Sequence, residues 1–286
     1  MKVFVICNPT SGNGTGLLVR QQVTEFLKEA AQEAVFYDTE RAFQATELAL
    51  KALAAGAETV IGIGGDGTMH EIAQALAGTQ TAFGIVPAGT GNDFVKTVHI
   101  PRDTRQALSL ILHGKARPVD TVRINDRLFL NECGCGFDVM VLDYAAGAKK
   151  YVKGILPYLH GVIQTIFHYR SLRLWLSVDD GPEQEKNLLV LAVGNGRFIG
   201  GGIPIAPSAD PDDGLLDLLQ VGDMTKARMF SVLPGLLKGK IETFPETAVQ
   251  RVRKLRLRGN GLRVNIDGEI ITLNEADIEV KPASLL

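Results

Sequence analysis

Three glycine-rich stretches contain the residue types that bind phosphate. They are NPTSGNGTG at Asn8–Gly16, GGDGT at Gly64–Thr68 and PAGTGND at Pro87–Asp93. Glycine lets backbone amides close around phosphate oxygens, and a helix that begins beside such a loop adds its positive end. Asp66 within the second stretch suggests a magnesium ion. For a single loop the alternative is a simple strand-to-helix turn in which Asp66 caps the helix, but three such loops favour a nucleotide site.

A second group of candidate residues consists of carboxylates in the other half of the chain. Phosphoryl transfer needs a metal ion to shield the phosphates and a group that accepts the acceptor's proton, and carboxylates do both. In NIDGEI, Asp267 and Glu269 flank Gly268. The alternative interpretation is an Asp-Gly hairpin turn followed by a solvated glutamate, and the pattern alone leaves both open.

The stretch SADPDDGLLDL crowds four acidic side chains together. It lacks the spacing of an EF-hand calcium loop, so a metal site and a polar turn remain equal alternatives. The preceding Gly194–Gly214 segment is too rich in glycine and proline, and too long, to be an idle connection, and we interpret it as lining a cleft. The four acids are Asp210, Asp212, Asp213 and Asp217.

The first part of the chain must place the glycine-rich loops together. Strand-like apolar runs alternate with helical segments at about 17–29, 42–55 and 69–77, which predicts right-handed crossovers and a parallel sheet. Ligands bind at the carboxyl ends of such strands, so the three loops should meet at one edge. The runs are Val3–Cys7, Ala34–Tyr37, Thr59–Ile63 and Ala82–Val86.

After Pro118 the pattern changes to many short alternating strands, which predicts an antiparallel sandwich or barrel. We expect one domain over residues 1–118, to which residues 276–286 return, and a second over residues 119–275. A helical interruption at about 143–169 should be broken into pieces by Gly154, Pro157 and Gly161.

Composition limits the classes of function. The chain has 286 residues, 45% hydrophobic and 22% charged, with a formal net charge of −2, which argues against nucleic acid as a partner. Its three cysteines form neither a zinc site nor a disulfide framework and fit a reducing cytoplasm. We find no secretory signal and no apolar run of about 18 residues, so we expect a protein that is neither exported nor membrane-spanning.

Other phosphate-binding motifs fit poorly. Gly62–Gly67 satisfies G-x-G-x-x-G, but the next strand ends in Pro87-Ala88-Gly89 where a dinucleotide fold needs an acid. The Walker A loop and the protein-kinase motifs are absent.

Five motifs together resemble the diacylglycerol kinase catalytic-domain family, the soluble lipid kinases of bacteria, which are related to sphingosine kinases and more distantly to NAD kinases. The motifs occur in the family's order and span nearly the whole chain: NPTSGNG, GGDGTMHEIAQAL, PAGTGNDFVKT, PDDGLLDLLQV and NIDGEI. The resemblance implies an α/β N-terminal lobe with a parallel sheet and a second, mainly antiparallel β-sandwich lobe. GGDGT alone is shared with NAD kinases.

The resemblance also implies ligand sites. A Mg²⁺ ion would be held by the side chain of Asp213 and the carbonyls of Asp210 and Leu215. ATP would be bound by Asn8, Pro9, Thr10, Ser11, Gly12, Thr39, Gly65, Asp66, Gly67, Thr68, Met69, His70, Glu71 and Thr90. His70 and Glu71 have packing and helix capping as their alternative role. Relatives can carry a lysine after the NPTSG glycine, whereas this chain has Asn13.

The implied reaction is ATP- and Mg²⁺-dependent phosphorylation of a lipid hydroxyl, with diacylglycerol converted to phosphatidic acid as the first expectation. Glu269 would be the general base, and Asp267 its partner that holds a water or metal. The rival functions are an NAD-kinase-like phosphotransferase and a nucleotide-binding regulator without transfer activity. We expect a cytoplasmic enzyme, peripheral at the inner membrane surface, with a lipid substrate there; a homodimer is left open.

Two segments raise the question of membrane contact. The strand RVRKLRLR carries Arg251, Arg253, Arg256 and Arg258, either as a solvated sheet face or as a basic patch for anionic lipid. The apolar residues of Tyr151–Phe167 at helical spacing indicate core packing, with interfacial insertion as the alternative.

Overall fold

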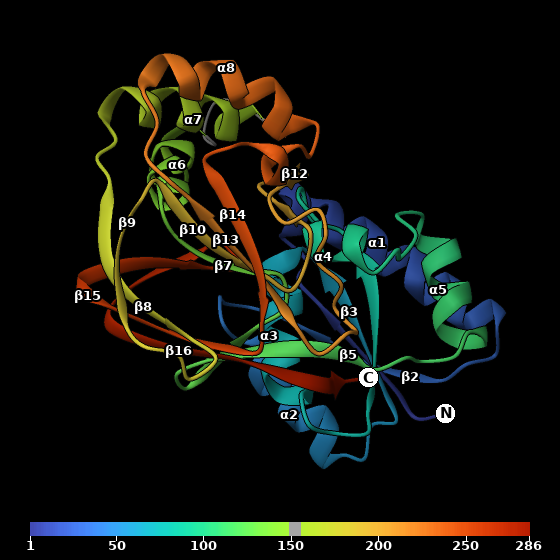
Figure 1. Cartoon of the computed structure of the whole chain (residues 1–286). Helices are drawn as coiled ribbons and strands as arrows, with labels where there is room; N and C mark the ends of the chain where they lie inside the picture. The colour runs from blue at the N-terminus through green and yellow to red at the C-terminus, as the bar shows by residue number, and fades with distance from the viewer. Residues whose placement is uncertain (149–155) are drawn as a thin grey trace. The chain divides into compact units, whose positions relative to one another are not determined.

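The computed structural model describes residues 1–148 and 156–286, which form two compact units. Unit 1 comprises Met1–Thr121 and the C-terminal Pro282–Leu286, and unit 2 comprises Val122–Lys281. Figure 1 shows the chain coloured from the N-terminus to the C-terminus.

Unit 1 contains a four-stranded parallel sheet in the order β2-β1-β3-β4. All residues of β1 and β3 are buried, as expected for central strands with helices on both faces. Each apolar run predicted from the sequence is a strand. The bounds are β1 Val3–Cys7, β2 Ala34–Asp38, β3 Thr59–Gly64 and β4 Ala82–Pro87.

Five helices of unit 1 connect and cover these strands (Figure 1). α1 and α5 pack against each other, and so do α2 and α3. α2 and α3 begin within a few residues of the predicted positions, and the regular part of α1 begins after the non-helical residues Gly12–Gly14, close to the predicted residue 17. α4 and α5 were not predicted. The bounds are α1 Ser11–Glu29, α2 Ala45–Ala54, α3 Asp66–Leu76, α4 Asp93–Thr97 and α5 Thr104–His113.

The C-terminal residues belong to unit 1 through backbone hydrogen bonds. The amide of Phe83 donates to the carbonyl of Leu286, and the amide of Gly78 donates to the carbonyl of Ser284, both at 2.6 Å. The Ser284 hydroxyl also accepts from the amide of Thr121 at 3.1 Å. These bonds hold the chain end beside β4 and the end of α3.

Unit 2 is built on a ten-stranded sheet in which the neighbouring strands β14-β13-β10-β7-β15-β16, β15-β8-β9 and β5-β6 pair antiparallel. Its main path runs β14-β13-β10-β7-β15-β16-β5-β6, and β8 and β9 join through β15. The strands are β5 Val119–Ile124, β6 Arg127–Phe129, β7 Glu132–Gly136, β8 Leu172–Val178, β9 Gln184–Leu188, β10 Val190–Gly194, β13 Leu216–Val221, β14 Thr247–Val252, β15 Lys254–Ile266 and β16 Glu269–Leu285; β11 Phe198–Ile199 and β12 Ile203–Pro204 pair separately.

The described residues of unit 2 also include three α-helices, α6 Phe137–Ala148, α7 Leu156–His168 and α8 Lys226–Leu237, and a short 3-10 helix η1 at Ile241–Thr243. The prediction that Gly161 breaks the helix is wrong, because Gly161 lies inside α7. A Cβ atom at Gly161 would collide with the carbonyl of Val141, so this glycine permits close packing of α6 and α7. Pro157 lies in the first turn of α7, where proline is tolerated, and Gly154 lies outside the described residues.

No helix in the described ranges combines the length and the hydropathy required to cross a bilayer.

Candidate functional site

The loop after β1 is held in shape by Asn8. Its side-chain oxygen accepts from the amide of Thr10 at 3.1 Å, and its side-chain nitrogen donates to the hydroxyl of Thr68 at 3.3 Å. Gly12, Asn13 and Gly14 then adopt left-handed backbone angles before the regular part of α1 begins. Glycine and asparagine tolerate this conformation best, which explains why Asn13 fits here. The hydrogen bond from Asn8 to Thr68 therefore joins the first loop to the start of α3.

The three glycine-rich loops approach one another closely within unit 1. A Cβ atom added to Gly65 would lie 3.1 Å from the Cα atom of Gly89. A Cβ atom on Gly12 would collide with the carbonyl oxygen of Ala88, so the first loop also touches the third. Only glycine permits these backbone contacts. The loops therefore meet at the carboxyl edge of the parallel sheet, as the strand order predicts.

Asp66, at the start of α3, connects the second loop to the third. Its Oδ1 accepts from the amides of Asp93 at 2.7 Å and Phe94 at 3.3 Å, which are the first two amides of α4. Asp93 is itself buried and pairs with Lys96 at 2.7 Å. The sequence indicated Asp66 of GGDGT as a site residue but did not indicate Asp93 of PAGTGND, whose amide bonds to Asp66.

Three other predicted ATP residues, on α3, have side chains that contact other residues of unit 1. Met69 is buried, its sulfur packs beside Gly62, and its amide donates to the carbonyl of Gly65 at 3.1 Å. Glu71 accepts from the amides of Phe43 at 3.3 Å and Ala45 at 2.9 Å, which is a capping role for α2. His70 lies 3.0 Å from the Gln74 amide group.

Several of these residues retain solvent access. Thr90 in the third loop is exposed, as is Gly67 at the start of α3, while Pro9 and Ser11 in the first loop are half-buried. Thr39, which follows β2, donates its amide to the carbonyl of Cys7 at 2.8 Å and so lies at the same sheet edge. Backbone amides and hydroxyls thus line the edge where the loops meet.

In unit 2, Asp267 and Gly268 form the turn between β15 and β16. Both have positive φ values, 48° and 94°, as a two-residue hairpin turn requires. The Asp267 carboxylate accepts from three successive amides, those of Leu130 at 2.8 Å and of Asn131 and Glu132 at 3.0 Å each. The motif therefore forms a hairpin turn, and Asp267 fixes that turn against the start of β7.

Glu269 directly follows this turn. Its side chain is 42% exposed, and its carboxylate lies 3.3 Å from the guanidinium of Arg127. Solvent access leaves this carboxylate available to a substrate, whereas the Asp267 oxygens already accept backbone hydrogen bonds.

A buried polar network supports the turn, and sequence reasoning missed it. Asn265 accepts from the amide of Gly268 at 2.8 Å and donates to the carboxyl group of Glu132 at 3.0 Å and to that of Asp138 at 3.5 Å. A Cβ atom at Gly134 would collide with an oxygen of each acid, so both acids lie against the same glycine. Glu132 is 2% exposed and Asp138 is 8% exposed.

The environment of this acid pair favours the protonated forms. Burial and the charges of Asp138 and Asp267 raise the pKa of Glu132 well above its usual range. Burial also raises the pKa of Asp138 to about 7, against hydrogen bonds that lower it. Within the described part of the chain, Glu132 Oε1 and Asp138 Oδ1 lack hydrogen-bond partners, which makes a buried charge on these groups more costly.

The predicted magnesium residues lie between β12 and β13. Asp213 accepts from the amide of Leu215 at 2.9 Å and forms an ion pair with Arg251. Among the described residues, no three His, Cys, Asp or Glu side chains gather as a metal cluster. A site made of one carboxylate and two backbone carbonyls does not need such a cluster. Asp217, on the following strand β13, has its pKa raised to about 6, chiefly by burial and further by the negative charges of Glu242 and Asp210.

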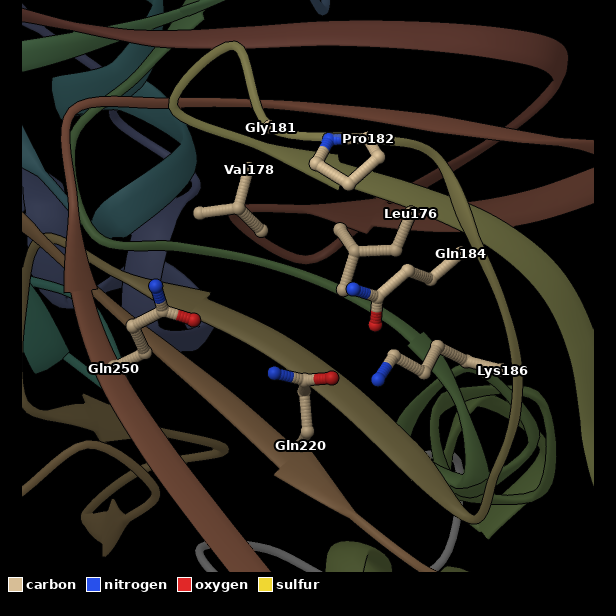
Figure 2. Close-up of a pocket in the computed structure, with 8 residues that line it drawn as sticks. All are labelled: Leu176, Val178, Gly181, Pro182, Gln184, Lys186, Gln220 and Gln250. Atoms are coloured by element: carbon tan, nitrogen blue, oxygen red, sulfur yellow. The ribbon is translucent and has the colours of Figure 1, made fainter.

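One shallow pocket of about 200 Å³ lies on unit 2 between β8–β9 and β13–β14 (Figure 2). Figure 2 shows the amide groups of Gln184, Gln220 and Gln250 and the amine of Lys186 facing it. Its volume is below the 300–1,000 Å³ or so of typical small-molecule sites. None of the predicted site residues lines it, so it adds nothing to the site.

Comparison with known proteins supports the same assignment. Residues 2–124 match the diacylglycerol kinase catalytic domain, and residues 132–286 match the YegS C-terminal NAD kinase beta sandwich-like domain. The chain is 30% identical to a diacylglycerol kinase of Mycobacterium tuberculosis over 99% of this chain and 94% of that protein. It is 34% identical to a Pseudomonas aeruginosa protein named "Probable lipid kinase YegS-like" over 90% of this chain and 85% of that one.

A solved structure of a diacylglycerol kinase from Bacillus anthracis superposes with a TM-score of 0.81 at 26% identity, covering 99% of this chain and 95% of that chain. The fold and these matches define a lipid kinase with a parallel α/β lobe and a mostly antiparallel β-sandwich lobe. The chain belongs to the diacylglycerol kinase family. The resemblance, the fold class and the kinase activity expected from the sequence are thereby confirmed.

Proposed function

We propose that the protein transfers the γ-phosphoryl group of ATP to the hydroxyl of a lipid, with diacylglycerol as the first acceptor to test. Its family supports a lipid acceptor, and kinases of this family imply ATP as the donor. The observation that carries the ATP assignment is the close approach of Gly65 to Gly89, because it brings the glycine-rich loops after β3 and β4 together at one edge of the parallel sheet.

In this proposal the three loops of unit 1 bind ATP. The amides at the start of α3 point along the helix axis, where the positive end of the helix dipole favours phosphate. The residues that would hold it are Asn8, Pro9, Thr10, Ser11, Gly12, Thr39, Gly65, Asp66, Gly67, Thr68, Met69, His70, Glu71 and Thr90. Met69 and Glu71 would support the site indirectly, because Met69 packs beside Gly62 and bonds its amide to Gly65, and the Glu71 carboxylate caps α2.

For the acceptor we assign Glu269 as general base. The lipid oxygen forms a bond to the γ-phosphorus, the bond from that phosphorus to the β–γ bridging oxygen breaks, the hydroxyl proton passes to the Glu269 carboxylate, and ADP leaves. Asp267 is a positioning residue that holds the turn. The side chain of Asp213 and the carbonyls of Asp210 and Leu215 would hold a Mg²⁺ ion, which would order the loop between β12 and β13.

The test is transfer of labelled phosphate from ATP to a panel of acceptors in mixed micelles with magnesium. The panel contains diacylglycerol, a sphingoid base, ceramide, phosphatidylglycerol and NAD. We expect label in a lipid product. Label in NADP would instead support the NAD-kinase function, and ATP-dependent thermal stabilisation without any transfer would support a nucleotide-binding regulator.

The base assignment is tested by Glu269→Gln with Glu275→Gln as matched control. Glu275 lies on the same strand, is 49% exposed and also pairs with an arginine, Arg256 at 3.2 Å. We expect the first change to lower kcat about 10²–10⁴-fold and the control to leave it unchanged. If Glu269→Gln retains full turnover while Asp267→Asn loses it without loss of stability, the base is Asp267.

We also propose that the enzyme works in the cytoplasm at the inner membrane surface, because its acceptor resides there. Cell fractionation tests this, with the protein expected in the membrane fraction at low salt and released by high salt. Recovery in the soluble fraction under both conditions would contradict it.

A further inference from the structure

The turn before Glu269 has one anchor on each of its two residues. At the first residue, the Asp267 carboxylate accepts from the amides of residues 130–132. The second residue, Gly268, has no partner for its amide in the β15–β16 ladder, because the ladder ends at the pair Ile266–Glu269. A side chain outside the ladder must therefore hold this amide.

Asn265 supplies the second anchor. Its side-chain oxygen accepts from the amide of Gly268 at 2.8 Å. Its side-chain nitrogen donates to Glu132 at 3.0 Å and, more weakly, to Asp138 at 3.5 Å. Asn265 is 4% exposed, so water competes little for these hydrogen bonds. A single buried side chain thus joins the turn to two buried acids.

The two acids determine which way the Asn265 amide group faces. The nitrogen of an asparagine side chain only donates, and the oxygen only accepts. The backbone amide of Gly268 is a donor, and the nearby oxygens of Glu132 and Asp138 accept. Rotation of the amide group by half a turn would set donor against donor and acceptor against acceptor. The acids therefore keep the Asn265 oxygen directed at the turn.

Strand β7 makes room for this arrangement. Asn265 on β15 is paired with Gly134 on β7. A Cβ atom at Gly134 would collide with an oxygen of Glu132 and with one of Asp138. Because position 134 carries no side chain, both carboxyl groups can lie beside Asn265. The register of β15 on β7 thus places the acids where they orient the asparagine.

The side chain of Glu269 has a weak restraint of its own. It is 42% exposed and lies 3.3 Å from Arg127, which is 46% exposed. An ion pair with this much exposure contributes little to holding a geometry. The position of the Glu269 carboxylate therefore depends on the backbone turn that precedes it.

We propose that Asn265 is a positioning residue for phosphoryl transfer, oriented by Glu132 and Asp138. Through the amide of Gly268, it fixes the turn so that the Glu269 carboxylate meets the acceptor hydroxyl at hydrogen-bond distance. Such alignment matters because a displacement of about 1 Å costs up to about 10²-fold in rate. The inference rests on the proposed function, in which Glu269 is the general base.

The first test measures the kinetics of Asn265→Ala with ATP, Mg²⁺ and diacylglycerol in mixed micelles. We expect kcat to fall about 10- to 100-fold and the KM for ATP to stay within about twofold, because the predicted ATP residues lie in unit 1. The matched control is Asn274→Ala on β16. Asn274 is exposed and also accepts from a glycine amide, that of Gly261 at 3.0 Å, so this control should keep the wild-type kcat.

A double-mutant cycle separates positioning from a loss of stability. Because Asn265 is inferred to act through Glu269, Asn265→Ala added to Glu269→Gln should lower kcat by less than about twofold further. A residue that only stabilises the fold would lower kcat by the same factor in both backgrounds. Equal factors would overturn the positioning role.

A second variant, Glu132→Leu, keeps the inference testable if Asn265→Ala does not fold. Leucine has a similar volume but offers no oxygen to the Asn265 nitrogen, and it removes a buried carboxyl group. We expect kcat to fall about three- to tenfold in protein whose Trp175 fluorescence shows it to be folded. Wild-type kcat in folded Glu132→Leu would overturn the orienting role of the acids.

Hydrogen–deuterium exchange tests the contact without any activity. The amide of Gly268 should exchange at least about tenfold faster in Asn265→Ala than in the wild type, and an unchanged rate would overturn the contact. Wild-type kcat in Asn265→Ala beside an inactive Glu269→Gln would overturn positioning alone. Full turnover of Glu269→Gln would overturn the base assignment and the route through Glu269, even where the Gly268 amide exchanges faster.

Discussion

Replacement of the buried Asp138 by asparagine should change how the stability of unit 2 depends on pH. Asp138 lies beside Glu132 with little solvent access, and its pKa is raised from 3.8 to about 7, chiefly by burial. The unfolded chain releases this proton near pH 4, whereas the folded protein keeps it until about pH 7. Stability contributed by the bound proton is therefore complete at low pH and is lost as pH rises through this window.

The magnitude follows from the size of the shift. A raised pKa of about three units, at about 1.4 kcal/mol per unit, corresponds to about 4 kcal/mol, of which about 3 kcal/mol falls between pH 5 and pH 8. Asp138→Asn keeps an oxygen that accepts from Asn265 but cannot ionise. We expect the fall in unfolding free energy between these pH values to become about 3 kcal/mol smaller in the variant.

Urea denaturation at pH 5 and pH 8 measures this difference. The single tryptophan, Trp175, lies in β8, so its fluorescence reports the unfolding of unit 2. Asp143→Asn is the control, since Asp143 lies on the same helix, is 43% exposed and pairs with Arg263 at 2.6 Å. The control should keep the wild-type pH dependence. Equal pH dependence of Asp138→Asn and the wild type would refute the protonated, buried acid pair.

Further predictions concern the loops, the metal and the turn. Gly89→Ala should weaken ATP binding about tenfold or more by calorimetry, because its Cβ would press on the backbone of Gly65, while Gly147→Ala, with nothing within 4 Å, should not. Asp213→Asn should raise the Mg²⁺ concentration needed for half-maximal activity. Arg251→Gln, which removes the cation that pairs with Asp213, should lower that concentration. The same Mg²⁺ dependence in both variants and the wild type would argue against this metal site. Asn265→Ala should destabilise unit 2 by about 2–3 kcal/mol in urea, with an unchanged midpoint as the contrary result.

The sequence predicted the parallel sheet well because its strands are short, continuous apolar runs between glycine-rich turns. All four predicted runs are strands, and the three loops that follow β1, β3 and β4 meet. The regular part of α1 was predicted to within a few residues, because Gly12–Gly14 lack helical periodicity and take left-handed backbone angles. Gly161 was misinterpreted because its close packing on Val141 leaves no trace in local sequence.

The buried network of unit 2 could not be predicted from the sequence. Asn265 and Glu132 are 133 positions apart and meet only because β15 pairs with β7, with Asn265 opposite Gly134. Such a contact depends on strand register, which the alternating pattern does not specify between distant strands. The Asp267–Glu269 motif was found because its turn is local, but the three amides that hold Asp267 come from the distant β6–β7 segment.

The central claim is tested most directly by incubating the purified wild-type protein with γ-labelled ATP, Mg²⁺ and diacylglycerol in mixed micelles, beside Glu269→Gln. The account predicts labelled phosphatidic acid from the wild type, and at least about a hundredfold less from the variant. Absence of label from every lipid offered to the folded wild-type protein, with ATP consumed or NAD labelled instead, would contradict it.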